Sequence, residues 1–315
     1  MTSGGDAPGM NAAIRAVVRA GMSFGLEVYG IRQAYKGLVN GEFERLDSRD
    51  VAGIIQRGGT MLQTARLPEF KEQRFQRKAM RNLAERAIDA LVVVGGDGSL
   101  TGALALHKAG IRVVGIPGSI DNDISGTDTS IGVDTALNTI LEAIDRLRDT
   151  ASSHQRVFLV EVMGRHCGYL AMAAGLITGA EVVLIPERKA TLEELGKALE
   201  HAYLTGKAHG MVVVAEGANL TCDQISDYLV QHDIGFEVRI TILGHVQRGG
   251  GPTAFDRLLA TRMGVAAVQA LVDEQSGTMT ALNGAAIVLK PLEEIIGKQR
   301  PINPQFVELA QLLTR

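Results

Sequence analysis

Short runs of β-branched residues alternate with helix-length amphipathic segments along the whole chain, and this alternation constrains the fold more than any other feature. The predicted strands are apolar on both faces and comprise Leu26–Ile31, Ala90–Val94, Arg112–Ile116, Val157–Val162, Val182–Ile185, Met211–Ala215, Val238–Leu243 and Ala285–Leu289. Parallel strands covered by helices on both sides have this pattern. Helices are predicted over Val133–Arg148, from apolar residues at three- and four-residue steps, and over Thr191–Tyr203, which opens with the capping-box pair Thr191 and Glu194. The pattern predicts an α/β fold with parallel sheets, of which we expect two.

Composition excludes several classes of protein. The 315 residues carry 32 Lys and Arg against 35 Asp and Glu, and the net charge of -3 gives no global attraction to nucleic acid or to anionic membranes. The two cysteines, Cys167 and Cys222, cannot form a disulfide framework and fit a reducing compartment. No uncharged apolar stretch reaches the ~18 residues of a membrane span. We therefore expect a cytoplasmic protein without a signal peptide and with neither a nucleic-acid nor a membrane partner.

Glycine, at 37 positions, gathers where predicted strands end. The first cluster, Thr2–Asn11, leads into a helix, and the second, Gly95–Ser99, follows the strand Ala90–Val94. A glycine-rich turn that opens a helix offers backbone N–H groups to a phosphate, and Asp97 is placed to hold Mg²⁺. A dinucleotide-binding turn is an alternative, but Asp97 inside it would repel a pyrophosphate that no cation neutralises. A plain strand-to-helix turn is the alternative for the first cluster.

The third cluster, Gly115–Asp123, follows the strand Arg112–Ile116 and carries Ser119, Asp121 and Asp123. Two carboxylates at this spacing can divide the work of a base for a substrate hydroxyl and of a Mg²⁺ ligand. An Asx-rich turn without chemistry is the alternative. Three such loops in one α/β chain favour function, because doubly wound sheets bind ligands at the carboxyl ends of their strands.

A fourth group is basic and lies at predicted strand ends or in the loops after them: Arg156, Arg165, Arg239, His245 and Arg248. Guanidinium groups match phosphate oxygens, so these residues favour a second anionic ligand. Glu216, also at a strand end, is suited to accept hydrogen bonds from sugar hydroxyls. A nucleotide phosphate with Mg²⁺, a base and a phosphate-bearing acceptor are the components of phosphoryl transfer.

These motifs resemble those of the bacterial ATP-dependent 6-phosphofructokinase family, over essentially the full length of the chain. The matching segments are Thr2–Asn11, Gly95–Ser99, Pro117–Asp123, Arg156, Met163–Gly168 and Gly244–Gly250 followed by Asp256-Arg257. The resemblance implies two interleaved Rossmann-like three-layer domains with mostly parallel sheets. It implies a nucleotide domain at 1–132 and 247–297, and a sugar-phosphate domain at 133–246 and 298–315.

The resemblance also implies that the γ-phosphoryl group of ATP is transferred to the 1-hydroxyl of fructose 6-phosphate with the help of Mg²⁺. The catalytic residues that it implies are Asp121 as the base, Arg165, Ser119, Gly5 and Arg66. The implied ATP-binding residues are Gly5, Tyr35, Arg66, Leu67, Gly96, Asp97, Gly98, Ser99 and Gly102. The implied sugar-phosphate residues are Ser119, Asp121, Arg156, Met163, Gly164, Arg165, Glu216, Arg239, His245 and Arg248. Asp97 and Asp123 are the implied Mg²⁺ ligands.

In the family, residues that match Arg156 and Arg239 reach in from a neighbouring subunit, so the resemblance implies a homotetramer with shared active sites. Five residues match the family's effector pocket for ADP or phosphoenolpyruvate: Arg15, Arg19, Arg148, Glu181 and Lys207. Ser48 and Thr205 stand where the family usually has basic residues, so we expect weak or altered regulation. Ser119 replaces the usual Thr, and Lys71 replaces a usual Arg near the nucleotide.

Other functions are weaker interpretations. Relatives that use pyrophosphate carry Asp and Lys where this chain has Gly98 and Gly118, so ATP is the expected donor. NAD and lipid kinases share the Gly-Gly-Asp-Gly loop but lack the segment Gly244–Gly250. A non-catalytic sugar-phosphate-binding subunit is a further alternative, and Asp121 and Arg165 argue against it. The family has a hydrophobic strand before the first glycine cluster, and we expect the natural protein to be a few residues longer than this sequence.

Overall fold

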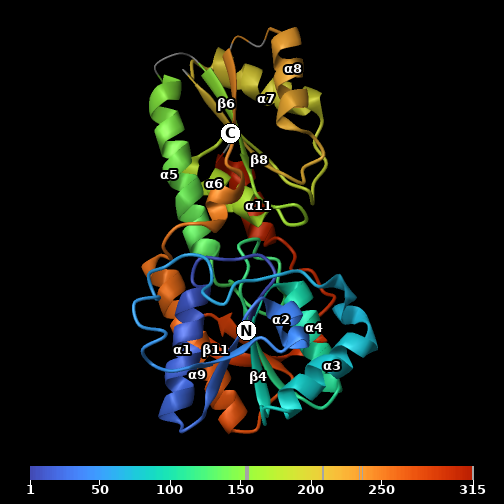
Figure 1. Ribbon diagram of the computed structural model, residues 1–315. Helices are drawn as coiled ribbons and strands as arrows, with labels where there is room; N and C mark the ends of the chain where they lie inside the picture. The colour runs from blue at the N-terminus through green and yellow to red at the C-terminus, as the bar shows by residue number, and fades with distance from the viewer. Residues whose placement is uncertain (153–155, 208, 234, 236, 314–315) are drawn as a thin grey trace. The chain divides into compact units, whose positions relative to one another are not determined.

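The computed structural model describes residues 1–152, 156–207, 209–233, 235 and 237–313 (Figure 1). The chain forms two compact units, each assembled from separate stretches of sequence. The first comprises Met1–Ile120, Ile124–Thr135 and Arg248–Arg300, and the second comprises Asp121–Asp123, Ala136–Gln247 and Pro301–Arg315.

The first unit is built on a five-stranded sheet in the order β1-β4-β5-β10-β11. The strands are β1 (Thr2–Ser3), β4 (Ala90–Gly95), β5 (Arg112–Pro117), β10 (Thr278–Asn283) and β11 (Ala286–Pro291). All neighbours are parallel except β10 and β11, which form an antiparallel pair. Ser3 pairs with Gly95 and Gly95 pairs with Pro117, so three consecutive strands end at the same level of the sheet.

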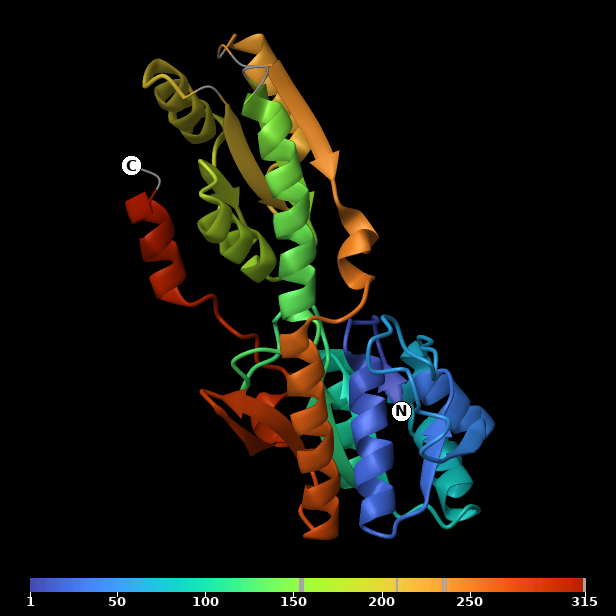
Figure 2. The ribbon, with the colours of Figure 1, turned by 90° about the vertical axis from the view of Figure 1, so that its left-hand side faces the viewer.

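Helices cover both faces of this sheet (Figures 1 and 2). On one face α1 (Met10–Ser23) and α9 (Ala254–Val272) lie side by side, and on the other lie α2 (Ala34–Asn40), α3 (Gln73–Ala84) and α4 (Asp97–Lys108). The buried core beneath α4 includes Leu91, Val93, Leu100 and Leu106. Two shorter helices complete the unit, the 3₁₀ helix η1 (Pro68–Lys71) and α10 (Leu292–Ile295).

A second, two-stranded sheet pairs β2 (Val28–Ile31) with β3 (Phe43–Leu46) in antiparallel register. The prediction of a parallel strand at Leu26–Ile31 is therefore wrong in orientation, although the strand exists. The antiparallel orientation is possible because antiparallel neighbours can be joined without the long crossover connection that parallel neighbours require. Within the described residues, the two expected sheets with parallel strands are present, and this two-stranded antiparallel sheet is additional.

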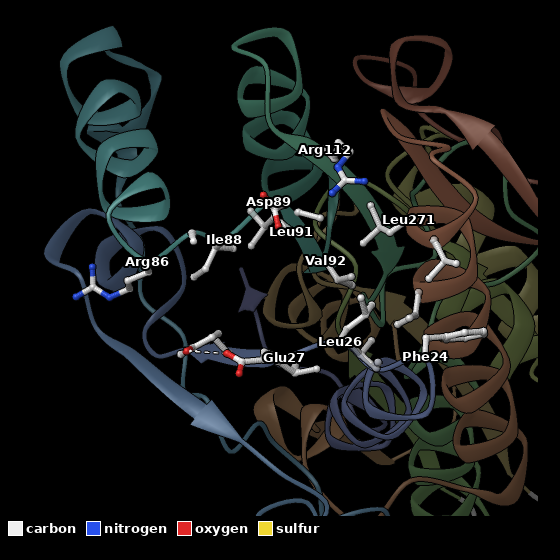
Figure 3. Close-up of a pocket in the computed structure, with 18 of the residues that line it drawn as sticks. Phe24, Leu26, Glu27, Arg86, Ile88, Asp89, Leu91, Val92, Arg112 and Leu271 are labelled. Carbon is white, nitrogen blue, oxygen red and sulfur yellow. Dashed lines mark hydrogen bonds between the residues drawn. The ribbon is translucent and has the colours of Figure 1, made fainter.

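A cavity of about 630 Å³ lies beside Met1 in the first unit (Figure 3). Leu91 and Val92 of β4 line one side of it, and Phe24 and Leu26, which follow α1, line another. The amine of Met1 donates to the carbonyl oxygen of Val92 at 2.8 Å. Because β1 pairs with β4 only at Val94 and Gly95, the first half of β4 borders the cavity on the side where β1 would continue, while its other side pairs with β5.

The second unit is built on a four-stranded, fully parallel sheet in the order β7-β8-β6-β9. Its strands are β6 (Arg156–Val162), β7 (Val182–Leu184), β8 (Gly210–Ala215) and β9 (Glu237–Ile242). Its helices are α5 (Val133–Ser152, which starts within the first unit), α6 (Tyr169–Thr178), α7 (Leu192–Leu204), α8 (Cys222–Gln231), the 3₁₀ helix η2 (Gly244–Arg248) and α11 (Pro304–Leu313).

Side chains of α7 and α8 form one core with the sheet, and α6 packs against β7 and β8. The predicted capping box at Thr191 and Glu194 is confirmed, and a second one joins Thr221 and Gln224. The strand β9 is present but mostly exposed, which differs from the prediction of two buried faces. It lies at the edge of the sheet and pairs only with β6, so its polar residues remain in water.

The α/β class with mostly parallel sheets is confirmed, and each predicted strand is present within a few residues of its expected bounds, although the predicted strand Ala285–Leu289 is the antiparallel β11 rather than a parallel strand. The strands β1, β3 and β10 were not predicted. Among the described helices, none combines the length and the apolar composition that a membrane crossing requires.

Candidate active site

The three glycine-rich loops of the first unit lie next to one another, as the parallel-strand pattern predicts. The amide of Gly118 donates to the carbonyl oxygen of Gly95 at 3.0 Å, which joins the third loop to the second. A Cβ atom built on Gly96 would lie 3.9 Å from the Cβ of Ser119, and one built on Gly4 would lie 3.1 Å from the Oγ of Ser99. The carboxyl ends of β1, β4 and β5 therefore form one continuous edge of loops.

The second loop opens α4 without a side-chain cap. Asp97 and Gly98 in the first helical turn are exposed, and a Cβ built on Gly98 would meet no atom within 4 Å. The positive end of the helix dipole, together with uncrowded backbone at Gly98, suits a phosphate group. Asp97 adds an exposed carboxylate to this site. A carboxylate and a phosphate repel each other, so the two can bind side by side only if a cation lies between them.

Tyr35 supports this loop from the interior. Its side chain is buried, its hydroxyl donates to the carbonyl oxygen of Ser99 at 2.5 Å, and its ring packs against Phe70 in a tilted arrangement with the centroids 4.3 Å apart. Burial raises the pKa of the Tyr35 hydroxyl far above its ordinary value, so the group stays a neutral donor. A Cβ on Gly102 would lie 2.6 Å from this ring, which explains why glycine is needed there.

The first loop is packed against a cation. A Cβ built on Gly5 would lie 2.4 Å from Nη1 of Arg248, and that nitrogen donates to the carbonyl oxygen of Asp6 at 3.3 Å. The structure thus places Arg248 beside the glycine turn of the first unit. Glycine at position 5 allows the guanidinium to approach the backbone of the turn closely.

A loop at residues 57–67 is tied to the first glycine turn. The side chain of Asn11, which is buried, donates to the carbonyls of Arg57 and Gly58 and accepts from the amide of Met61. Thr64 donates its hydroxyl to the carbonyl oxygen of Gly4 at 2.8 Å. Arg66 and Leu67 follow on this loop, and Arg66 is exposed. Sequence reasoning missed Asn11 and Thr64, because only their contacts across about 50 residues reveal what they do.

The third loop carries an unusual backbone conformation at Asn122, between Asp121 and Asp123. Asn122 has φ of 53° and is 1% exposed. A buried non-glycine residue in the left-handed region is uncommon, and such residues cluster at functional sites. Asparagine tolerates this conformation better than most residues, so the residue type and the turn agree.

In the second unit, Gln247 links the loop after β6 to the turn at η2. Its Oε1 accepts from the amide of Met163 at 3.1 Å and its Nε2 donates to the carbonyl oxygen of Gly244 at 2.9 Å, while the side chain is 0% exposed. Gly164 has φ of 137°, and a Cβ there would lie 2.4 Å from the carbonyl oxygen of Cys167. His245 in η2 is exposed. Sequence reasoning assigned no role to Gln247.

Arg165 and Glu216 lie together after the carboxyl ends of β6 and β8. Arg165 Nε is 3.9 Å from Oε1 of Glu216, and the Arg165 side chain is 76% exposed, so the cation is available to a ligand. A Cβ on Gly217 would lie 2.0 Å from the carbonyl oxygen of Arg165. Glycine at position 217 therefore allows the two loops to approach each other closely. Nearby on β6, burial raises the pKa of Glu161, and the charges of Glu216 and Asp223 raise it further.

Arg156 and Arg239 lie elsewhere in the second unit. Arg156 is the first residue of β6 and donates to Glu237 at 2.6 Å, whereas Arg239 is inside β9 rather than at a strand end, and also pairs with Glu237. Val162 at the carboxyl end of β6 is six residue steps beyond Arg156, a distance of roughly 20 Å. Within one chain, Arg156 is therefore remote from Arg165, whereas Arg239 lies opposite Phe158, nearer the carboxyl end of the sheet.

The five expected effector residues divide between the units. In the second unit, Glu181 accepts from Lys207 at 3.1 Å and from the amide of Met211 at 2.6 Å, and Arg148 donates to the carbonyl oxygen of Thr178. Arg15 and Arg19 are on α1 of the first unit.

Among the described residues, no group of three or more His, Cys, Asp or Glu side chains is arranged to hold a metal ion. Asp97 and Asp123 belong to different units. Each carboxylate by itself fits Mg²⁺ chemically, because this ion is usually held by one or two carboxylates with substrate phosphates and water.

Comparisons with known proteins agree with this fold. The Phosphofructokinase family profile matches residues 1–271. The chain is 52% identical over 315 residues to the ATP-dependent 6-phosphofructokinase of Thermotoga neapolitana, covering 100% of this chain and 98% of that protein. It is 51% identical to the ATP-dependent 6-phosphofructokinase 1 of Thermus thermophilus, covering 99% and 97%.

Solved structures show the same fold. The chain superposes on Pichia pastoris phosphofructokinase in the T-state with a TM-score of 0.90 and 42% identity, covering 99% of this chain and 36% of that one. A pyrophosphate-dependent phosphofructokinase from Marinobacter aquaeolei gives a TM-score of 0.86 at 22% identity, covering 99% and 90%.

The mostly parallel sheet of the first unit and the parallel sheet of the second, with glycine-rich loops at the carboxyl ends of strands, define an α/β protein of the class that binds ligands at such edges. The match over the full length is more specific than the fold. The chain belongs to the phosphofructokinase family.

Proposed function

We propose that this protein is an ATP-dependent 6-phosphofructokinase, which transfers the γ-phosphoryl group of ATP to the 1-hydroxyl of D-fructose 6-phosphate and releases ADP and fructose 1,6-bisphosphate. The observation that carries the proposal is the roughly 50% identity over full length to enzymes of that name. The adjacent glycine loops of β1, β4 and β5 support it, because phosphoryl transfer depends mainly on positioning and charge neutralisation.

On the nucleotide side, the glycine loops give backbone groups to the phosphates. Gly5, Gly96, Gly98, Ser99 and Gly102 are the residues proposed for this role, with Tyr35, Arg66 and Leu67 around them. Mg²⁺ would be held by Asp97 and Asp123 and would neutralise phosphate charge. We assign this domain to 1–132 and 247–297, and the sugar-phosphate domain to 133–246 and 298–315.

On the acceptor side, Asp121 takes the proton from the sugar 1-hydroxyl, and Ser119 donates a hydrogen bond to the transferred group. Arg165 and Arg66 place positive charge where negative charge develops. Met163, Gly164, Glu216, His245 and Arg248 hold the sugar phosphate. The position of Arg248 beside Gly5 also gives that cation access to the nucleotide loop.

The identity of the donor follows from two glycines. The space around Gly98 is open, so the backbone there can approach a nucleotide phosphate, whereas an aspartate would occupy that space with a negative charge. A Cβ at Gly118 would lie 3.2 Å from Met10 and 3.3 Å from Val94, so a lysine at 118 would require these side chains to move. Both positions favour ATP.

The protein is proposed to act in the cytoplasm as a homotetramer with shared active sites. Arg156 and Arg239 are proposed to serve the neighbouring subunit, and the distance of Arg156 from Arg165 within one chain supports this sharing. Arg148, Glu181 and Lys207, with Arg15 and Arg19, form the proposed effector pocket for ADP or phosphoenolpyruvate. Ser48 and Thr205 predict that this regulation is weak.

The test is phosphorylation of fructose 6-phosphate by the purified protein, with Mg·ATP or pyrophosphate as donor. Turnover is expected with ATP only, and Asp121→Asn should lower kcat by at least about 100-fold, as loss of a general base does. Asp128→Asn changes a carboxylate of the same loop that binds Gly284 and serves as the control. Turnover with pyrophosphate would contradict the assigned donor, and a folded, inactive protein would indicate a non-catalytic sugar-phosphate-binding subunit.

A further inference from the structure

The carboxylate of Asp256 is completely buried and lies where the ends of three loops meet. It is 0% exposed, on the first turn of α9, and none of the functional roles assigned above involves it. Its Oδ1 accepts from the amide of Gly132 at 2.9 Å. Its Oδ2 accepts from the amide of Thr135 at 2.8 Å and from the Thr135 hydroxyl at 2.6 Å.

These bonds cap α5 from outside that helix. Gly132 immediately precedes α5, and Thr135 is its third residue, so their amides are donors that the helix itself cannot satisfy. A glycine before the helix has no side chain with which to cap it. Asp256 supplies both oxygens instead, in the positions that a capping box would fill from within the helix.

The capping is reciprocal. The amide of Thr253, the N-cap of α9, donates to the Thr135 hydroxyl at 3.0 Å, and the Thr253 hydroxyl donates to Asp134 at 2.6 Å. The Thr253 hydroxyl also accepts from the Asp256 amide at 3.3 Å. Each of the two helix N-termini thus satisfies polar groups of the other, and the threonine and aspartate side chains form one connected network.

The first glycine loop reaches the same point. A Cβ built on Gly9, which precedes α1, would lie 2.6 Å from Ile131 and 3.6 Å from the Cβ of Asp256. A Cβ built on Gly132 would lie 2.8 Å from the Cβ of Ala7. The segment before α1 therefore packs against Asp256 and Gly132, while the carboxylate itself lies at the N-termini of α5 and α9, whose positive dipole ends favour its ionised form.

Burial raises the pKa of Asp256 above its ordinary value, while the bonds from Thr135 and Gly132 lower it. Burying a carboxylate costs desolvation free energy. Because both oxygens of this carboxylate accept hydrogen bonds, the groups that donate to it are held in one arrangement. The loops that end here carry Gly5, which is proposed to bind the nucleotide phosphates, Ser119, which is proposed to bind the transferred group, and Arg248, which is proposed to hold the sugar phosphate.

We propose that Asp256 is a positioning residue for phosphoryl transfer, which holds the ends of these three loops at fixed distances without touching a substrate. The inference rests on the proposed kinase activity. A displacement of reacting groups by about 1 Å can cost 100-fold in rate, so the expected effect lies on kcat.

The experiment compares Asp256→Asn with the wild type. Asparagine keeps the shape of the side chain but turns one acceptor into a donor that faces an N–H or a hydroxyl. We expect kcat to fall about 10- to 100-fold, with the KM values for ATP and fructose 6-phosphate changed less than about threefold. Hydrogen exchange measured by mass spectrometry should become faster in the peptides that contain residues 130–135 and 253–257.

Thr191→Ala is the matched control, because it removes the capping threonine of α7 far along the chain and shares no residue with the network. It should lower stability while leaving kcat unchanged, which separates positioning from simple loss of a helix cap. If Asp256→Asn does not fold, Thr135→Val replaces it, since valine keeps the size and loses only the hydroxyl. A fall in kcat of at least about threefold is then expected.

Two results would overturn the inference: a folded Asp256→Asn protein with kcat within twofold of the wild type, or an equal fall in kcat for Thr191→Ala. A wild type that turns over neither donor would instead refute the proposed function, so the two failures are distinguishable.

Discussion

Open space around Gly98 makes this position a direct probe of donor binding. Its Cβ position has no neighbour within 4 Å and its backbone conformation is ordinary, so substitutions do not strain the fold. Gly98→Asp would place a carboxylate at the start of α4, beside Asp97. We expect the KM for ATP to rise at least about tenfold, because like charges repel at a phosphate site, and the melting temperature to stay close to that of the wild type.

Gly98→Ala is the control for this substitution, since it adds the Cβ atom without charge. It should keep the KM for ATP within a few-fold of the wild type and stabilise α4 by about 0.5–1 kcal/mol. Steady-state kinetics with a thermal melt measures both. An unchanged KM in Gly98→Asp would mean that the nucleotide phosphates do not approach this turn.

At the scale of single residues, the sequence predicts the chemistry of exposed groups better than the work of buried ones. Asp97, Gly98 and Arg165 stand out because their types and their places after strands suffice to suggest a role, and all are exposed. Asn11 and Gln247 were missed, because each acts through bonds to backbone groups of a distant segment. The sequence alone does not show whether an Asn or Gln side chain is buried and hydrogen-bonded to a distant loop.

At the scale of elements, Gln247 joins the loop after β6 to the turn after β9. Gln247→Leu would leave the amide of Met163 and the carbonyl of Gly244 without this partner, and each unsatisfied buried group costs about 1–3 kcal/mol. We expect a loss of about 2–4 kcal/mol in the free energy of unfolding and a higher KM for fructose 6-phosphate, with the KM for ATP little changed.

Gln231→Leu offers the comparison, because Gln231 is exposed at the end of α8. Urea denaturation and kinetics of both variants decide the matter. Equal stability of the two variants, or a KM change confined to ATP, would show that Gln247 does not hold the sugar-phosphate loops.

Of the strands that were not predicted, β10 is the hardest to recognise from the sequence. It lies between β5 and β11 in the sheet, yet Thr278, Thr280 and Asn283 give it a polar composition. Thr280 is buried because its hydroxyl donates to the carbonyl oxygen of Gly115 at 3.4 Å, so hydrogen bonding replaces the expected apolar residue. The strand β9 shows the opposite case, an apolar-looking run that lies at an exposed edge.

At the scale of the whole molecule, both cysteines report on the integrity of the second unit. Cys167 and Cys222 are buried, and burial raises the pKa of the Cys167 thiol to about 11 and that of the Cys222 thiol to about 12. The raised pKa values keep both thiols protonated at pH 8, and only the thiolate reacts. We expect iodoacetamide to modify neither cysteine in the native protein and both in denaturant.

Mass spectrometry of intact protein counts the modifications, with free cysteine in the same solution as the control for reagent activity. Rapid modification of either residue under native conditions would show that its part of the second unit opens readily. The rate of modification across urea concentrations then measures the opening of this unit independently of catalysis.

Recognition of the whole molecule from the sequence depends on motifs rather than on periodicity. The alternation of strands and helices predicts the α/β class, but it does not say which strands are neighbours. Sheet order in the first unit joins residues 2–3 to 94–95 and residues 114–115 to 278–279, pairings that no local pattern contains.

The same strand order has a consequence for how the protein folds while the ribosome synthesises it. The sheet of the second unit uses strands from a single stretch between Arg156 and Ile242, so it can assemble as soon as that stretch has emerged. The sheet of the first unit cannot be completed until β10 and β11 are synthesised, although it contains the first residues of the chain. The N-terminal strands therefore lack part of their sheet while the second unit folds. During that interval their exposed strand edge and apolar surface favour binding by chaperones.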